Sequence, residues 1–293
     1  MFLGLFIGRT IFAPVHYHLP HLRYGRAETD VSTTTGAQGV NSTLGTAAII
    51  TLNAASRPDR RDIMALMASV TNVKLTFMDA WTRKPIDKAM PNEHNPNLKD
   101  VEYACWRTHA DAWRKVVEEG WTTAMILEDD VDWDGGIHES MNLAWEALKN
   151  ITGDPQAATT ATSYSSDSKR GLICRWDIFY TGTCMDLPAK TYLIYDDPHL
   201  PRTSTWWIDA IYTAYFSTTA SIRRLIQPTV EPVCTHSYIV SQTGARKLLY
   251  HTNQFLPWGV DVAIIKMVNK GTIKGYSIVP PLFVTRWHNK TDL

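Results

Sequence analysis

Several features that often reveal a protein's class are scarce or missing in this 293-residue chain. The formal net charge is zero, so nothing attracts the chain to a phosphate backbone over long range, and we expect no nucleic-acid partner. The four cysteines include no CxxC pair, which excludes a zinc ribbon and a thioredoxin-like motif. No internal repeat is visible. The apolar start, residues 1–15, is broken by Arg9 and is shorter than the ~20 residues of a membrane helix, which leaves membrane association open.

The first part of the chain reads as a tail. Its polar stretch AETDVSTTTGAQGVNSTLGT is poor in large apolar residues, so we expect residues 1–45 to be a flexible N-terminal tail. The apolar segment does not begin with basic residues and lacks a small-residue cleavage site, and a signal-anchor remnant is one interpretation of it. Three glycosylation sequons, at Asn41, Asn150 and Asn289, favour the lumen of the Golgi or endoplasmic reticulum. A cytoplasmic location is the alternative.

The cysteines carry a second weak signal for that location. Cys105 falls on a helical pattern and is predicted to be a buried thiol. The other three, Cys174, Cys184 and Cys234, have enough members for one disulfide, and we predict the pair Cys184–Cys234.

Apolar strand patterns alternate with amphipathic helix patterns over residues 46–293. Short apolar runs predict strands at 46–53, 73–80, 122–127 and 176–182. Helices are expected at 56–70, where Ile63, Leu66, Met67 and Val70 fall at helical spacing, and in the stretch 102–121, ended by Gly120. Further helices follow in 137–150, after Ser241, and in 260–271, whereas residues 152–171 read as a flexible loop. The order predicts a single α/β domain with a mainly parallel sheet.

Five carboxylates follow the strand at 122–127 within seven positions: Glu128, Asp129, Asp130, Asp132 and Asp134. Like charges this close repel unless something positive lies among them. In α/β sheets, ligands bind beyond the carboxyl ends of the strands, where this cluster falls. We therefore predict a divalent cation, Mn²⁺ or Mg²⁺, bound to some of these carboxylates.

Three other interpretations of the cluster were weighed. A solvated acidic turn rarely gathers five acids. An EF-hand calcium loop is rejected because its twelfth position holds Met141 in place of glutamate, and because a strand pattern precedes it. A phosphotransferase with Asp130 as nucleophile stays an alternative, although no downstream lysine and acid set completes it.

Five segments in order carry a resemblance to a known family. They are ITLNAASRPDRR, ACWRTHADAWRKVVEEGWTTAMILEDDVDW, WDIFYTG, CTHSYIVSQTGARKLL and GVDVAI. Together they span roughly residues 47–285 and resemble glycosyltransferase family 25, which includes lipopolysaccharide and procollagen galactosyltransferases. The resemblance implies a Rossmann-like glycosyltransferase fold of the A type. It also implies a UDP-sugar donor, often UDP-galactose, and inversion at the anomeric carbon.

The chain departs from the family pattern in four places. Asn53-Ala54-Ala55 stands where the family has Asn-Leu-Asp, Thr108 precedes His109 in place of serine, and Ala80 follows Asp79 in place of glycine. The segment 185–230 has no counterpart that we can match. The first three departures leave Asn53, Asp79 and His109 as donor-binding residues by resemblance, and the fourth leaves the acceptor side unassigned.

The cluster and its surroundings give the predicted metal and donor sites. Asp130 and Asp132, two positions apart on an extended segment, share one side and are the predicted metal ligands. His236 is a predicted third ligand, with His288 as a competitor. Glu128 and Asp129 are expected to contact the ribose or base, or to order the metal ligands.

The remaining predicted roles concern the diphosphate and the attacking hydroxyl. Arg57 and Arg60 follow the first strand, and their guanidinium groups suit a diphosphate. Asp261 opens a predicted helix and is the predicted general base, which an inverting transfer needs within reach of the attacking oxygen. Asp177 and Asp186 are alternative bases.

The sequence therefore predicts a metal-dependent glycosyltransferase that moves a hexose from a UDP-sugar donor to a hydroxyl of a glycan or glycoprotein acceptor. Galactose is favoured by resemblance, and glucose is the alternative. A catalytically silent domain that binds nucleotide sugars is the competing hypothesis from another class.

Overall fold

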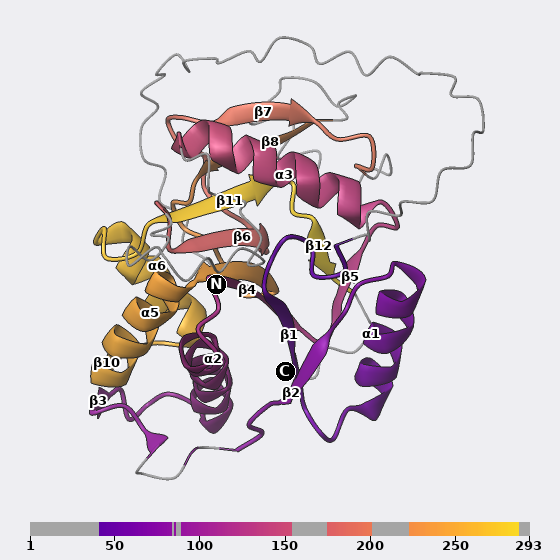
Figure 1. The fold of residues 1–293 in the computed structure, drawn as a ribbon. Helices are drawn as coiled ribbons and strands as arrows, with labels where there is room; N and C mark the ends of the chain where they lie inside the picture. The colour runs from indigo at the N-terminus through magenta and orange to yellow at the C-terminus, as the bar shows by residue number, and fades with distance from the viewer. Residues whose placement is uncertain (1–40, 84, 86–88, 154–174, 201–222, 287–293) are drawn as a thin grey trace, which may run out of the picture.

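An eight-stranded sheet forms the centre of the protein in a computed structural model, which describes residues 41–83, 85, 89–153, 175–200 and 223–286 (Figure 1). The strand order is β2-β1-β4-β9-β6-β11-β8-β7. Strands β2, β1 and β4 are parallel neighbours, as are β6 and β11, whereas β9 and β8 run against their neighbours. The fold is thus the predicted single α/β, Rossmann-like domain with most strands in one direction. The reversed direction of β8 and β9 was not predicted.

The strands of this sheet are short and, at its centre, fully buried. They are β1 (Ala48–Asn53), β2 (Thr76–Asp79), β4 (Thr123–Glu128), β6 (Ile178–Gly182), β7 (Leu193–Asp196), β8 (Arg223–Pro228), β9 (Ser237–Ser241) and β11 (Gly275–Val279). Two small ribbons flank it: β3 (Glu93–His94) pairs with β10 (Phe255–Leu256), and β5 (Val131–Trp133) pairs with β12 (Phe283–Thr285). The β5–β12 ribbon matters below because β5 directly follows the acidic cluster.

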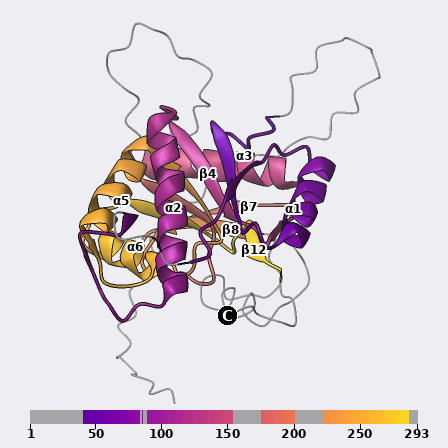
Figure 2. The same ribbon diagram turned by 90° about the horizontal axis from the view of Figure 1, so that it is seen from below.

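Helices cover both faces of the sheet (Figure 2). They are α1 (Pro58–Val70), α2 (Asp100–Glu118), α3 (Ile137–Thr152), α5 (Gln242–Gln254) and α6 (Val260–Asn269). Helices α1 and α3 pack on one face, and α2, α5 and α6 pack on the other. The alternation of side chains along β4 serves both layers, because Met125 and Leu127 join the first core and Ala124 and Ile126 join the second.

Local signals in the sequence set several helix ends. Gly120, with φ of +68°, ends the segment after α2 in the left-handed conformation that glycine adopts without steric cost. Ser241 caps α5, and its Oγ accepts a hydrogen bond from Gly244 N at 3.0 Å. Both agree with the prediction. By contrast, α1 begins at Pro58 with Arg57 as its N-cap residue, one position later than the predicted Ser56.

The buried face of α1 also differs from the prediction. Met64 and Ala68 are its buried residues, whereas Ile63, Leu66 and Val70 are exposed to 37%, 65% and 79%. The apolar residues of this helix occupy two faces, and the face with four-residue spacing is the one that meets the sheet.

Ordered packing begins slightly before the predicted boundary at residue 45. Leu44 is buried, and its carbonyl accepts a hydrogen bond from Trp145 Nε1 at 2.9 Å. Ser42 O accepts from Lys74 N at 2.7 Å. Most of the predicted tail and most of the predicted loop at 152–171 lie outside the described residues. No helix in the described part of the chain has both the length and the apolar content that crossing a bilayer requires.

The predicted disulfide is present. Cys184, after β6, is bonded to Cys234, before β9, with their Cα atoms 5.5 Å apart. Cys105 is a free, half-buried thiol on α2, and burial raises its pKa. Cys174 lies outside the residues that the structure describes.

Candidate active site at the carboxyl ends of β1 and β4

The acidic cluster lies where the connections of the sheet change sides. From β1, the chain passes through α1 to β2 at one edge, and then returns through α2 to β4 on the other side of β1 (Figure 1). Because α1 and α2 cover opposite faces, β1 and β4 diverge at a topological switch point, the place where open α/β sheets bind ligands. Asn53 ends β1 and Glu128 ends β4, so the predicted residues do meet at this point.

Asp129 is the anchor of the cluster. Its carboxylate is buried and accepts hydrogen bonds from Asn53 Nδ2 at 2.7 Å, Ala54 N at 3.3 Å and Arg60 at 2.8 Å. These donors come from the end of β1 and the start of α1, so Asp129 fastens β4 to the neighbouring strand and helix. Both oxygens of this carboxylate are therefore occupied by donors of the protein, and its predicted roles toward the nucleotide or the metal ligands stay predictions.

Arg60 provides positive charge inside the cluster. Its guanidinium lies 2.8 Å from Asp129 Oδ1 and 3.4 Å from Asp130 Oδ2. Part of the repulsion among the carboxylates is therefore offset by the protein itself. Arg57, the other predicted diphosphate ligand, makes a two-pronged ion pair with Asp59, at 2.9 and 2.7 Å. Diphosphate binding by either arginine stays a prediction.

Asp130 differs from its neighbour in one respect. Its Oδ1 is buried and has no hydrogen-bond partner in the described part of the chain. A buried anionic oxygen without a donor is unfavourable, and native proteins rarely keep one without a ligand or function. Asp132, on β5, accepts a hydrogen bond from Trp133 N at 2.8 Å through one oxygen. Both are hard oxygen donors that suit Mn²⁺ or Mg²⁺.

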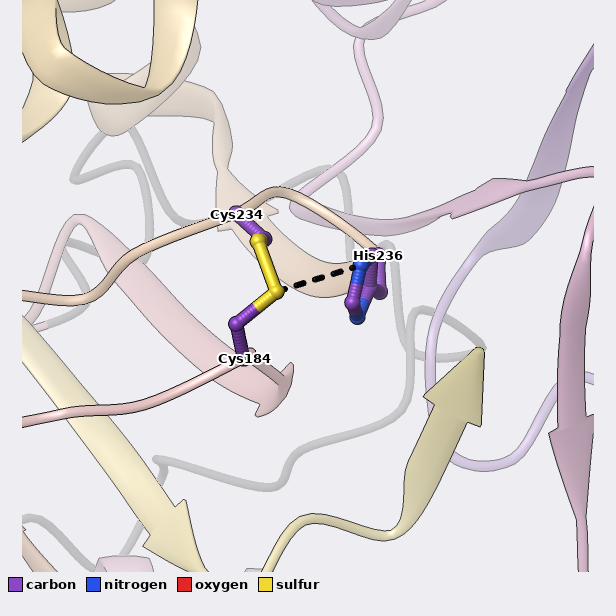
Figure 3. A group of neighbouring side chains, drawn as sticks. All are labelled: Cys184, Cys234 and His236. Carbon is purple, nitrogen blue, oxygen red and sulfur yellow. Dashed lines mark hydrogen bonds between the residues drawn. A yellow bond between two sulfur atoms is a disulfide. The ribbon is translucent and has the colours of Figure 1, made fainter. Parts of the chain in front are cut away.

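His236 does not join these two acids in the structure. Its Nε2 lies 3.6 Å from Cys184 Sγ and 2.9 Å from Thr285 Oγ1 (Figure 3). Within the described ranges, the one group of three metal-ligating side chains with ligand atoms all within 4.8 Å of one another is Cys184, Cys234 and His236. The predicted set of Asp130, Asp132 and His236 is therefore not assembled here. The competitor His288 lies outside the described residues.

Glu128 is held from behind by Thr235. Thr235 Oγ1 donates a hydrogen bond to Glu128 Oε1 at 2.7 Å, and the backbone NH of Glu128 donates to His236 O at 3.0 Å. The side chain keeps 30% exposure on its open side. Burial raises the Glu128 pKa to about 7, and the negative charges of Asp130, Asp129 and Asp261 add to the effect.

His109 lies beneath Glu128 rather than on the surface. It is buried on α2, with Nε2 3.9 Å from Glu128 Oε1 and Nδ1 2.8 Å from the hydroxyl of Tyr238. Trp113 Nε1, which can only donate, gives its hydrogen to that same hydroxyl at 2.8 Å. Burial lowers the His109 pKa to about 4, so the imidazole is neutral at pH 7. The predicted role of His109 in donor binding stays a prediction; in the structure the residue lies against Glu128.

The opposite pKa shifts of Glu128 and His109 predict an unusual pH dependence of stability in metal-free protein. Between about pH 4.5 and 6.5, the unfolded chain has ionised glutamate and protonated histidine, whereas the folded chain has both groups neutral. Each state binds one proton, so the pair adds no pH dependence there. Replacing either residue should therefore expose the pH dependence of stability that the other residue causes.

We expect Glu128→Gln to lose stability as pH falls from about 6.5 to about 4, because the folded state resists protonation of His109. His109→Gln should instead lose stability as pH rises from about 4.5 to about 7, because Glu128 must ionise. Each slope is at most about 1.4 kcal/mol per pH unit. Urea unfolding in chelator across this range measures both, and slopes identical to wild type in both variants would contradict the coupling.

The predicted bases fall in different surroundings. Asp261 is half-buried in the first turn of α6, accepts from Val262 N at 2.8 Å, and is near enough to raise the pKa of Glu128. Asp177 precedes β6 at the other end of the sheet and binds Lys247 at 2.7 Å. Asp186 is buried and accepts hydrogen bonds from several groups, Thr229 and Ser277 among them. Of the three, Asp261 is the one whose charge acts on Glu128, and its role as the base stays a prediction.

Two further donor-side predictions find positions near the switch point. Asp79 is exposed at the end of β2, directly beside Asn53 in the register of the parallel strands. Asn53 itself is buried, and its amide is committed to Asp129 and to Arg57 O. Asn53 thus orders the acidic cluster, whereas Asp79 keeps an open face.

Three residues with clear roles in this geometry were missed from the sequence: Thr235, Tyr238 and Thr285. Thr235 is adjacent to the predicted His236, so its position in CTHSY was the available signal. No local pattern in the sequence pointed to Tyr238 or Thr285, because their hydrogen-bond partners, His109 and His236, are distant along the chain.

The fold and the acidic strand end agree with the predicted glycosyltransferase, and the comparison with known families shows that class. The sequence model of glycosyltransferase family 25, described as an LPS biosynthesis protein, matches residues 46–264. Since this match covers well over half of the chain, the protein belongs to glycosyltransferase family 25. Comparison with curated proteins gave no match.

Proposed function

We propose that this glycosyltransferase moves a hexose, galactose or alternatively glucose, from a UDP-sugar to a hydroxyl of a glycan or glycoprotein, with inversion at the anomeric carbon. One observation supports this most: at the switch point between β1 and β4, a buried carboxylate oxygen of Asp130 has no hydrogen-bond partner among the described residues. A diphosphate leaving group gains negative charge as its bond to the sugar breaks, and a divalent cation at these carboxylates would neutralise it.

The protein's own groups would act around that cation. Asp130 and Asp132 would hold Mn²⁺ or Mg²⁺, since such ions are bound through one or two carboxylates together with substrate phosphates. Asp129 and Arg60 keep Asp130 in place. Asp261 would accept the proton of the attacking hydroxyl, and Asp79 offers an open carboxylate to the nucleotide.

The disulfide and the sequons support a proposed location in the lumen of the Golgi or endoplasmic reticulum, because disulfides persist in oxidising compartments. The cytoplasm is the alternative. The described residues contain no membrane helix to decide how the enzyme would be held near an acceptor.

Release of UDP tests the proposal directly. The purified chain would be mixed with UDP-galactose, UDP-glucose or UDP-N-acetylglucosamine, with Mn²⁺ or with chelator, and free UDP would be measured. We expect release that requires the metal and favours galactose or glucose. Calorimetric titration of UDP with and without Mn²⁺ separates the alternatives. Metal-dependent UDP binding without release from any donor would favour the silent binding domain, and absence of such binding would contradict the sugar-nucleotide site.

A further inference from the structure

A sulfur-containing cluster stands beside the acidic site but takes no part in the proposed reaction. Cys184 Sγ, Cys234 Sγ and a ring nitrogen of His236 lie within 4.8 Å of one another (Figure 3). In the structure the two sulfurs form a disulfide. We propose that, once this disulfide is reduced, Cys184, Cys234 and His236 form a binding site for Zn²⁺, distinct from the carboxylate site for Mn²⁺ or Mg²⁺.

The backbone keeps the ligands together without the disulfide. The segments that carry the two cysteines form an antiparallel bridge between Met185 and Val233. Two hydrogen bonds of 2.9 Å join them, from Cys184 N to Val233 O and from Val233 N to Met185 O. Breaking the bond between the sulfurs therefore leaves the ligand-bearing segments side by side, and the sulfurs can separate by rotation of their side chains.

The spacing along the chain also suits a metal. Cys234 and His236 are two positions apart, and the turn between them brings their ligand atoms within 4.8 Å of each other. Cys234 has φ of +69°, a conformation that residues other than glycine seldom adopt and that often accompanies functional sites. Cys184 contributes the third ligand from across the bridge.

The distances and ligand types select the metal. Zn–S bonds of about 2.3 Å and Zn–N bonds of about 2.0–2.1 Å place tetrahedral ligand atoms about 3.6 Å apart. Cys184 Sγ lies 3.6 Å from His236 Nε2. Thiolates and imidazole are soft or borderline ligands that favour Zn²⁺ over Mg²⁺ or Mn²⁺. Because Cys184 is exposed, a fourth position is open to solvent.

The redox step balances with a dithiol as reductant. The dithiol gives two electrons and two protons and becomes a disulfide, and each cysteine sulfur becomes a thiol. Binding of Zn²⁺ then releases both protons, because thiolates are the ligands. The chain would carry the disulfide in an oxidising compartment and the metal in a reducing one.

Hydrogen bonds connect this cluster to Glu128 in the acidic site. Thr235 stands between the two ligands Cys234 and His236 and donates to Glu128 at 2.7 Å, while His236 O accepts from Glu128 N. Either the disulfide or the metal fixes this turn. The site itself does not depend on the proposed transferase reaction, and its test uses binding rather than activity.

Cobalt spectroscopy tests the site. The full chain would be reduced with a phosphine, which is oxidised to its oxide, then desalted without oxygen and titrated with Co²⁺. We expect the near-ultraviolet band of thiolate-to-cobalt charge transfer and the visible bands of tetrahedral cobalt, both removed by Zn²⁺. The oxidised chain should show neither. Absence of the charge-transfer band from the reduced native chain would overturn the proposal.

Two variants guard against adventitious binding and unfolding. The double variant Cys184→Ser, Cys234→Ser retains Cys105 and Cys174, and the same spectrum from it would overturn the proposal. His236→Gln retains both thiols and should weaken Zn²⁺ binding by at least about 10- to 100-fold, the range found even for indirect metal partners. Equal affinity in this variant would mean that the thiols bind without the histidine, as an unfolded chain would, and would also overturn it.

Discussion

Asp130→Asn is expected to reduce metal-dependent UDP release by at least about 100-fold, the equivalent of losing a few kcal/mol of charge stabilisation in the transition state. The substitution keeps the shape of the side chain but removes the charge from the buried oxygen that has no partner in the described chain. Stability should change little, within about 1 kcal/mol, because Arg60 keeps its shorter contact with Asp129.

The matched control is Asp62→Asn, which removes a carboxylate from the exposed face of α1. It should leave both UDP release and stability unchanged. Steady-state rates at saturating Mn²⁺ and UDP-sugar, with urea unfolding of each variant, provide both readouts. Release at the wild-type rate from Asp130→Asn would show that this carboxylate does not hold the cation, and Asp132→Asn would be the next variant.

The fold was largely readable from the sequence because its elements carry strong local patterns. Helix α2 repeats its apolar residues at helical spacing, and His109, Trp113 and Val116 are buried as expected. The direction of β8 and β9 could not be read this way, since a strand pattern is the same in either orientation and pairing is decided by distant partners. Helix α1 misled in part: of its predicted apolar residues, Met67 packs against the core, whereas Ile63, Leu66 and Val70 are exposed.

The site was readable as a location but less so as a set of roles. Spacing identified the carboxylates at the end of β4, yet consecutive residues there point in different directions. Asp129 turns toward Asn53 and Arg60, whereas Asp130 keeps an oxygen without a donor. His236 turned toward a disulfide that the sequence suggested only as a pairing of cysteines. Such differences depend on contacts between residues that are distant along the chain.

Asp129→Ala is expected to destabilise the protein by about 3 kcal/mol, the lower end of the range for breaking a buried ion pair by removing one partner. The lower end applies because Arg60 is 23% exposed and retains access to water and to Asp130. The variant also leaves the buried amide of Asn53 and the backbone NH of Ala54 without their acceptor. Urea unfolding measures the loss.

A double-mutant cycle with Arg60→Met separates the contribution of the Asp129–Arg60 ion pair from that of the hydrogen bonds of Asp129 with Asn53 and Ala54. If the pair carries much of the effect, the two substitutions together should cost less than the sum of the single losses, by about 1–3 kcal/mol. Additive losses would show instead that Asp129 acts mainly through Asn53 and Ala54. Either result would set Asp129 apart from Asp130, because Asp129 is bonded to the end of β1, whereas one oxygen of Asp130 has no hydrogen-bond partner in the described part of the chain. A loss below about 1 kcal/mol for Asp129→Ala would contradict this division of roles between neighbouring carboxylates.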